Sequence, residues 1–117
     1  MKELFKDIMN VDGVEGALLF SSDGSLIYSD IATKRYRKPR ESDWIAFING
    51  LADFREADLT FESMRLYTRK TDAGFLVILL ANSASMAMVR LNCDIILPSL
   101  KQDAGGKGIS RFFKLKK

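Results

Sequence analysis

The sequence contains no histidine and only one cysteine, Cys93. Without histidine it lacks the commonest general base and the commonest neutral metal ligand. It also lacks the glycine motifs that bind nucleotides and phosphates. Cys93 falls on an apolar stripe of a predicted helix, where a cysteine is usually a small buried hydrophobe, and it can form no internal disulfide. We therefore predict a protein that is not an enzyme and that holds no metal and no cofactor.

Long apolar runs are also missing, since none approaches the roughly 20 residues of a membrane-spanning helix. Glu3, Lys6 and Asp7 interrupt residues 1–10, so these do not resemble a signal peptide. The length of 117 residues suits one domain, and 47% apolar with 28% charged residues is typical of a globular protein. We expect a cytoplasmic protein with a folded domain, residues 1–101, followed by a basic and flexible tail, residues 102–117.

Basic residues are concentrated in two segments. Residues 101–117 have six Lys/Arg and one Asp, whereas the first 100 residues have 12 basic and 14 acidic side chains. Residues 34–40 hold five basic side chains in seven positions. Such runs are usually solvated loops or tails, and the alternative is contact with an anionic protein, lipid or nucleic acid. The candidate partner-binding residues are Arg35, Arg37, Arg40, Arg111 and Lys114.

Apolar and basic side chains alternate near the end of the tail, at Phe112, Phe113 and Leu115. This mixture suits weak contact with an anionic membrane, although a solubilising tail is the simpler interpretation. No zinc-finger, helix-turn-helix or aromatic sheet pattern accompanies the basic charge, so we do not expect nucleic acid as a partner.

Residues 13–29 predict a β-hairpin, because two apolar runs flank Asp23-Gly24 and the glycine accepts a positive φ. An amphipathic helix over residues 1–10 precedes it. Farther along, residues 57–62 and 65–69 alternate apolar with polar side chains, which indicates two strands. Six consecutive apolar residues, 75–80, then indicate a buried central strand.

The last predicted helix covers about residues 85–97 or a little beyond, and Pro98 should end or kink it near residue 97. Arg90 and Asp94 are spaced for an ion pair within this helix. Besides the stripe that contains Cys93, the helix has a second apolar stripe, which indicates cover on more than one side. This second stripe consists of Met88, Leu91 and Ile95.

The predicted middle helix, residues 42–53, spreads its apolar side chains over about half of its circumference. Its narrow back carries Ala46 and Gly50, and a glycine inside a helix costs about 1 kcal/mol relative to alanine. Either Gly50 has no structural role and is merely tolerated, or a helix of a second subunit packs closely across it in a two-fold dimer. The strand over residues 57–62 is a candidate edge that could pair with its own copy.

This order of elements resembles the Roadblock family, relatives of the dynein light chain that also occur in bacteria beside small GTPases. The residues that carry the resemblance are 11–18, Asp23-Gly24, 57–80 and the helix from Ser85, and it covers about residues 1–100. It implies an α+β fold of profilin-like order, α-β-β-α-β-β-β-α. The five-stranded antiparallel sheet would have the two terminal helices on one face and the middle helix on the other.

The resemblance also implies a homodimer that acts as a platform for a small Ras-like GTPase, as an activating partner, scaffold or adaptor. The alternative function is a profilin-like domain that binds a small ligand or an anionic surface through the basic loop and tail. Carried onto this sequence, the implied dimer interface consists of Trp44, Ala46, Phe47, Gly50, Leu51, Phe54, Leu59 and Phe61.

Overall fold

The computed structural model describes residues 2–32, 41–51, 53–62 and 65–102, without the side chains of residues 41–44, 101 and 102. No helix in these ranges is long and apolar enough to cross a membrane. The elements, in chain order, are the 3-10 helix η1 (Lys2–Phe5), α1 (Lys6–Met9), β1 (Val14–Phe20), β2 (Leu26–Ile31), α2 (Glu41–Gly50), β3 (Glu56–Thr60), β4 (Arg65–Thr71), β5 (Gly74–Leu80) and α3 (Met86–Gln102).

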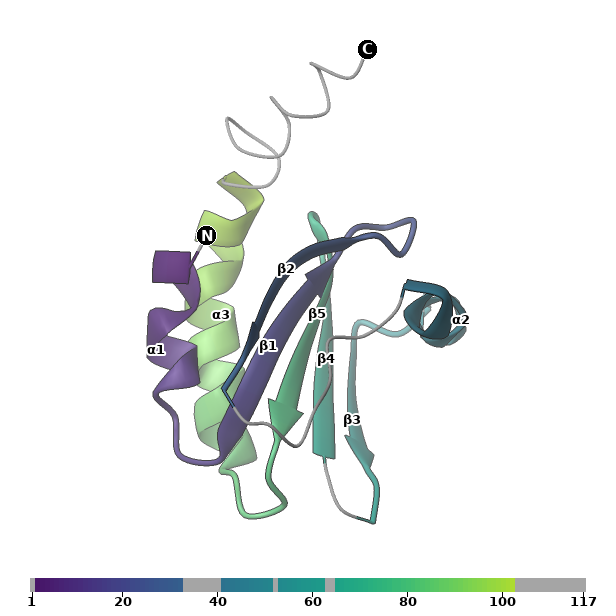
Figure 1. Cartoon of the computed structure of the whole chain (residues 1–117). Coiled ribbons are helices and arrows are strands. Elements are labelled where there is room, and N and C mark those ends of the chain that lie inside the picture. Colours follow the sequence, from purple (N-terminus) through teal and green to yellow (C-terminus); the bar gives the residue numbers. More distant parts are fainter. Residues whose placement is uncertain (1, 33–40, 52, 63–64, 103–117) are drawn as a thin grey trace.

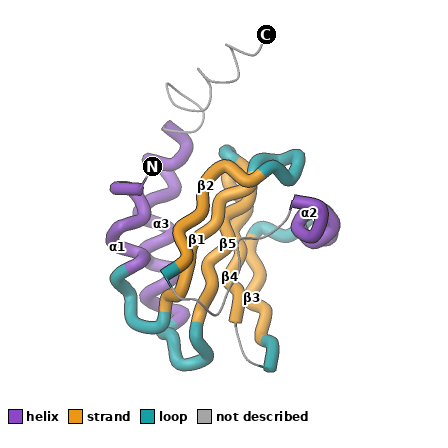
Figure 2. The backbone as a smooth tube through the Cα atoms, viewed as in Figure 1, coloured by secondary structure: helices purple, strands orange, loops and turns teal. Residues whose placement is uncertain are grey.

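The strands form one five-stranded sheet in the order β2-β1-β5-β4-β3, in which every neighbouring pair is antiparallel. α1 and α3 lie side by side on one face of this sheet, and α2 lies on the other (Figure 1). The tube view shows the same three layers, with β2 and β3 as the two edges (Figure 2). The predicted fold class and the predicted division of the helices between the two faces are therefore confirmed.

The central strands β1 and β5 are apolar on both faces, which explains why their sequences are continuous apolar runs rather than alternating ones. Successive side chains of a strand point to opposite faces, so each strand supplies two separate cores. The core under α1 and α3 takes Ala17, Leu19, Leu76, Ile78 and Leu80. The core under α2 takes Leu18, Phe20, Phe75, Val77 and Leu79.

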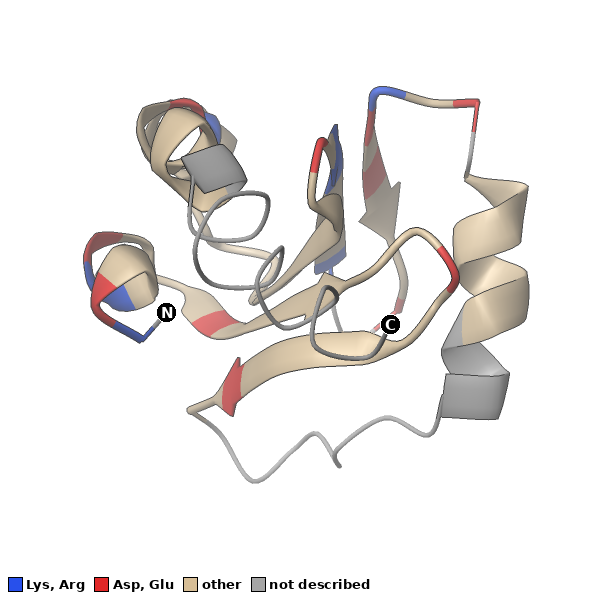
Figure 3. Ribbon diagram, turned by 90° about the horizontal axis from the view of Figure 1, so that it is seen from above, with Lys and Arg blue, Asp and Glu red and all other residues tan. Residues whose placement is uncertain are grey.

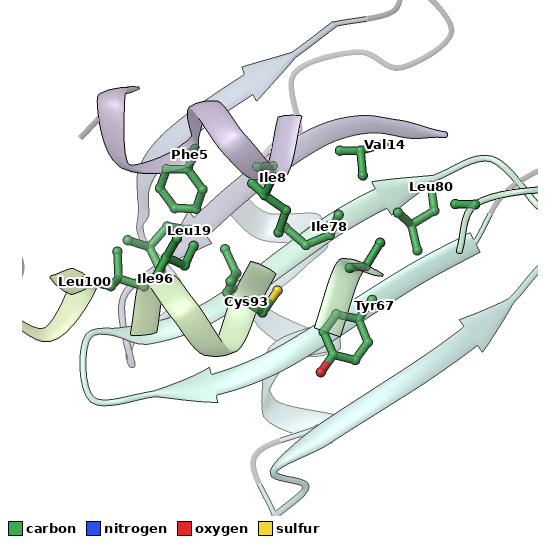
Figure 4. Close-up of a cluster of buried hydrophobic side chains, with 14 residues drawn as sticks. Phe5, Ile8, Val14, Leu19, Tyr67, Ile78, Leu80, Cys93, Ile96 and Leu100 are labelled. Atoms are coloured by element: carbon green, nitrogen blue, oxygen red, sulfur yellow. The ribbon is translucent and has the colours of Figure 1, made fainter. Parts of the chain in front are cut away.

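The core under α1 and α3 is closed by buried helix side chains, and Figure 4 shows the ones that it labels pointing toward the sheet. Phe5 also stacks on Tyr28 of β2 with ring centroids 4.9 Å apart, which holds η1 and α1 over the β1–β2 half of the sheet. The closing helix residues are Phe5, Ile8, Val89, Cys93, Ile96 and Leu100.

The core under α2 has much thinner cover. Among the described side chains of α2, only Ile48 is fully buried, while Phe47 packs at the margin of this core. The sheet residues of this core are buried, but the described part of α2 supplies only this one fully buried side chain to it.

Two details of the helices differ from the sequence prediction. The first helix is split into a 3-10 turn and one α-helical turn, η1 and α1. α3 continues through Pro98 to Gln102, so Pro98 does not end it. Proline removes one backbone hydrogen bond in a helix. Leu100 is the last residue of α3 whose side chain is described, and its full burial anchors the turn that follows Pro98.

Glycine is required where the chain turns between β4 and β5. Gly74 has φ +136°, and a Cβ added to it would overlap the carbonyl oxygen of Phe20. By contrast, a Cβ on Gly50 would meet no heavy atom within 4 Å. The two glycines therefore have opposite sensitivities to substitution.

We expect Gly74→Ala to lower the free energy of unfolding by roughly 2–4 kcal/mol, because it adds backbone strain and a steric overlap. The matched variant Gly50→Ala should be neutral or gain up to about 1 kcal/mol from helix propensity. Urea denaturation of both variants measures the difference, and equal stability of the two would contradict it.

Candidate interaction surface

Exposed apolar side chains gather around α2 and β3. Ile45 is 39% exposed, Phe54 is 57% exposed and Phe61 is 46% exposed. Between Ile45 and Gly50 α2 has no charged residue, so this part of the helix is tan in the view from above (Figure 3). We call these three residues, together with α2 and β3, the α2–β3 surface.

β3 is an edge strand, because it pairs with β4 and ends the strand order. An edge strand presents unpaired backbone groups that can pair with another chain. Ala57 and Leu59 alternate along β3 with Glu56, Asp58 and Thr60, and Leu59 packs against the core under α2. The apolar face of the edge strand is therefore the one on the α2 side.

The eight predicted interface residues divide into three groups. Ala46, Gly50, Phe54 and Phe61 are exposed, whereas Phe47, Leu51 and Leu59 are half-buried. The side chain of Trp44 lies outside the described residues. The interface assignment stays a prediction, and the exposed group supplies the surface that another chain could contact.

Ile45 was not among the predicted interface residues, yet it links α2 to the hairpin turn. A Cβ added to Gly24 would lie 2.6 Å from the Cγ1 atom of Ile45. Asp23 stabilises the same turn, because the backbone N–H of Ser25 donates to its carboxylate over 3.0 Å. The Asp-Gly pair gives the turn in the sequence, but its contact with α2 depends on tertiary packing that local sequence does not reveal.

The predicted partner-binding arginines and lysine fall elsewhere in the chain. Arg35, Arg37, Arg40, Arg111 and Lys114 all lie outside the described residues. Their role stays a prediction.

A polar network joins α3 to β3 and β4. Arg90 binds Glu56 with 2.6 Å between Nη2 and Oε1, and Arg69 binds Asp94 with 2.8 Å between Nη1 and Oδ1. The Tyr67 hydroxyl donates to Glu56 over 2.5 Å and accepts from Arg69 over 3.0 Å. The predicted helix residues Arg90 and Asp94 thus bind the sheet, which spacing along one helix could not reveal.

An open groove of about 450 Å³ runs along this network and is also lined by Arg55. On the same face of the sheet, Arg65 makes a two-bond contact with Asp58, at 2.9 Å from Nε and 2.7 Å from Nη2. The two carboxylates of β3 are therefore both paired with arginines of the same chain, and the side of β3 that faces α2 is apolar.

The network shifts the ionisation of its members. Hydrogen bonds from Tyr67 and then from Arg90 hold the pKa of Glu56 below its usual value. Burial, with the hydrogen bond to Glu56, raises the pKa of Tyr67 to about 12. Burial also raises the pKa of the Cys93 thiol to about 12, so this cysteine is a poor nucleophile at neutral pH.

The described ranges contain no group of three or more His, Cys, Asp and Glu side chains that could hold a metal ion. The ionisable side chains of this region hold α3 against the sheet. Among the charged side chains of β3, Glu56 and Asp58 have partners within the chain.

We expect Glu56→Gln to destabilise the fold at pH 7, and the deficit should shrink as the pH falls below about 4.5. The pKa of Glu56 is lowered in the folded state from its ordinary value of 4.5, so its contribution to stability is present above that value and is lost on acidification. The side chain of Glu56 is 35% exposed, so solvent screening keeps the effect modest. Thermal unfolding between pH 3 and pH 7 tests this, with the exposed carboxylate variant Glu62→Gln as the control. A deficit that does not change with pH would contradict it.

Comparison by sequence identifies no relative: no protein-family model and no curated protein matches this chain. Comparison of the structure finds several similar folds. A Roadblock/LC7 domain from Streptomyces avermitilis superposes with a TM-score of 0.68 at 16% identity, over 86% of this chain and 94% of that chain.

Two MglB structures are similar as well. MglB from Myxococcus xanthus gives a TM-score of 0.63 at 22% identity, over 84% of this chain and 85% of its own. An MglB with a tetrameric arrangement gives 0.64 at 19% identity, over 85% of this chain and 83% of its own. The sheet order, the three helices and their division between the two faces thus place this chain in the Roadblock/LC7 fold.

Proposed function

We propose that this chain is a non-catalytic, cytoplasmic interaction module, which forms a homodimer through the α2–β3 surface and binds a small Ras-like GTPase as an activating partner or adaptor. The observation that carries the dimer is the exposure of apolar side chains in α2 and at the two ends of an edge strand. Ile48 is the only fully buried side chain among those described in α2, while Ile45 in α2, Phe54 before β3 and Phe61 after it are exposed.

A two-fold dimer would pair the open edge of β3 and would also cover the exposed apolar side chains. Pairing of β3 with its own copy would remove the open edge and extend the sheet across the two subunits. Close contact between the two copies of α2 is supported by Ala46 and Gly50, which are exposed and small. The apolar side chains that flank α2 and β3 would then lie in a continuous interface.

The GTPase partner is supported by the fold and by the family resemblance in the sequence. Roadblock/LC7 and MglB structures share this architecture, and one relative is described as a gliding protein from Thermus thermophilus. A tetrameric arrangement of MglB shows that this fold supports assembly in at least one similar protein. The absence of histidine from the sequence and the burial of Cys93 favour an interaction role over intrinsic catalysis.

We expect the wild-type chain to have twice the 13.2 kDa mass of one chain in light scattering at tens of micromolar. Gly50→Trp should shift it to the monomer, because the indole would block close approach of a second α2. A Cβ at Gly50 would meet no described heavy atom within 4 Å, so we expect one chain to keep its fold, which circular dichroism of the variant checks. Gly50→Ala is the matched control and should stay dimeric. A wild type that is already monomeric would remove the proposed dimer.

We expect a purified Ras-like GTPase of the source organism to bind this chain more tightly with a GTP analogue than with GDP. A difference of about 5–150-fold corresponds to an ordinary coupling free energy of 1–3 kcal/mol. Titration calorimetry of each nucleotide state against the wild-type chain measures it. Because the platform requires both subunits, Gly50→Trp should weaken the binding.

Equal affinity for the two nucleotide states, for every Ras-like GTPase of that organism, would overturn the proposed partner. It would leave the dimer itself intact, because light scattering tests the dimer separately. Unchanged GTPase binding by monomeric Gly50→Trp would instead show that one chain is sufficient.

A further inference from the structure

The outer side of α3 carries a second set of exposed apolar side chains, which the α2–β3 surface does not include. Met88 is 47% exposed, Leu91 is 52% exposed and Ile95 is 62% exposed. They lie about 140° around the helix from the side that packs on the sheet. We call these three residues the outer stripe. The residues of α3 that face the sheet are Val89, Cys93, Ile96 and Leu100.

At its Met88 end, the outer stripe meets a groove of about 610 Å³ between α1 and α3. Asp7 and Asp12 line this groove together with Val11 and Asn92, and none of its lining residues is Lys or Arg. Apolar and acidic surface are thus continuous here. An occupant that matches this surface needs apolar side chains together with positive charge.

The residues that follow α3 have this composition. We call residues 103–117 the tail; it lies outside the described residues, and its sequence carries five basic side chains against one acidic. Its apolar side chains are Ile109, Phe112, Phe113 and Leu115. Its basic side chains are Lys107, Arg111, Lys114, Lys116 and Lys117.

The tail is long enough to reach the groove. From Met88 to Gln102 the axis of α3 rises about 21 Å, while fifteen extended residues span up to about 50 Å. Gly105 and Gly106 follow shortly after α3, and glycine permits the reversal of direction that a return along the helix needs.

We propose that the tail folds back along α3 of its own chain, with its phenylalanines on the outer stripe and its basic side chains at Asp7 and Asp12. Docking in this way covers the outer stripe and engages the basic charge of the tail. An anionic partner of the tail must then compete with the groove for it.

Attachment to α3 favours the chain's own tail over a separate partner. A segment joined by a short flexible connection has an effective concentration in the millimolar range, so weak contacts suffice to hold it. The tail of a second copy has the same composition and is the main competing occupant, and the test below separates the two.

A nitroxide spin label on Ser110→Cys in the full-length chain tests the proposal. Cys93 does not compete for the label, because it is fully buried and its thiol has a pKa of about 12. We expect paramagnetic broadening of backbone amides near the outer stripe and at Asp12, with little at β3. Raising the salt concentration should reduce it, because the acidic groove and the tail attract each other by charge.

Two matched variants show whether the outer stripe is the docking site. Leu91→Asp should lose most of the broadening, whereas Phe54→Asp, an equally exposed position on the α2 side, should keep it. Uniform broadening, or an unchanged pattern in Leu91→Asp, would overturn the proposal. A mixture of spin-labelled chain at natural isotope abundance with ¹⁵N-labelled chain that carries no spin label reports contact between molecules. If broadening in this mixture accounted for the whole effect, the stripe would bind the tail of a second copy, which would likewise overturn docking within one chain. Neither result depends on the α2–β3 dimer.

Discussion

The whole structure depends on two central strands that are apolar on both faces. β1 and β5 bury nearly every side chain, so neither face of the sheet can be left to water. One face is covered by η1, α1 and α3, which supply six fully or nearly fully buried side chains. The other is covered by α2, whose described part supplies Ile48 alone. This asymmetry between the two layers supports the proposal that the exposed apolar side chains near α2 form an interface.

The two sides of the edge strand β3 also differ in charge. Arg65 holds Asp58, and Arg90 with Tyr67 holds Glu56, so the carboxylates on the α3 side of β3 have partners within the chain. Leu59, on the other side, continues the apolar surface of α2. A second copy of β3 could therefore approach without burying an unpaired carboxylate of Glu56 or Asp58. The network thus has two consequences: it fastens α3 to the sheet, and it leaves the α2 side of the edge apolar.

Features governed by periodicity were predictable from the sequence, and features governed by contacts between distant segments were not. The apolar runs of β1 and β5 and the Asp23-Gly24 turn gave the strands close to their observed bounds. Of the two effects predicted for Pro98, an end of the helix is not observed: α3 continues to Gln102, and Leu100 is fully buried beyond the proline. Likewise, helical spacing pairs Arg90 with Asp94, whereas the sheet offers each of them a better-placed partner.

The two exposed apolar regions differ in a way that bears on their roles. The α2–β3 surface lies beside an open strand edge and has no charged residue between Ile45 and Gly50, so its properties suit the proposed contact with a second copy. The outer stripe has no strand edge and adjoins Asp7 and Asp12, so it is complementary to a basic and apolar segment. The proposed self-association and the proposed docking of the tail would therefore use opposite faces of one sheet. Because the faces are separate, a partner that displaced the tail from α3 need not disturb the proposed contact between the subunits.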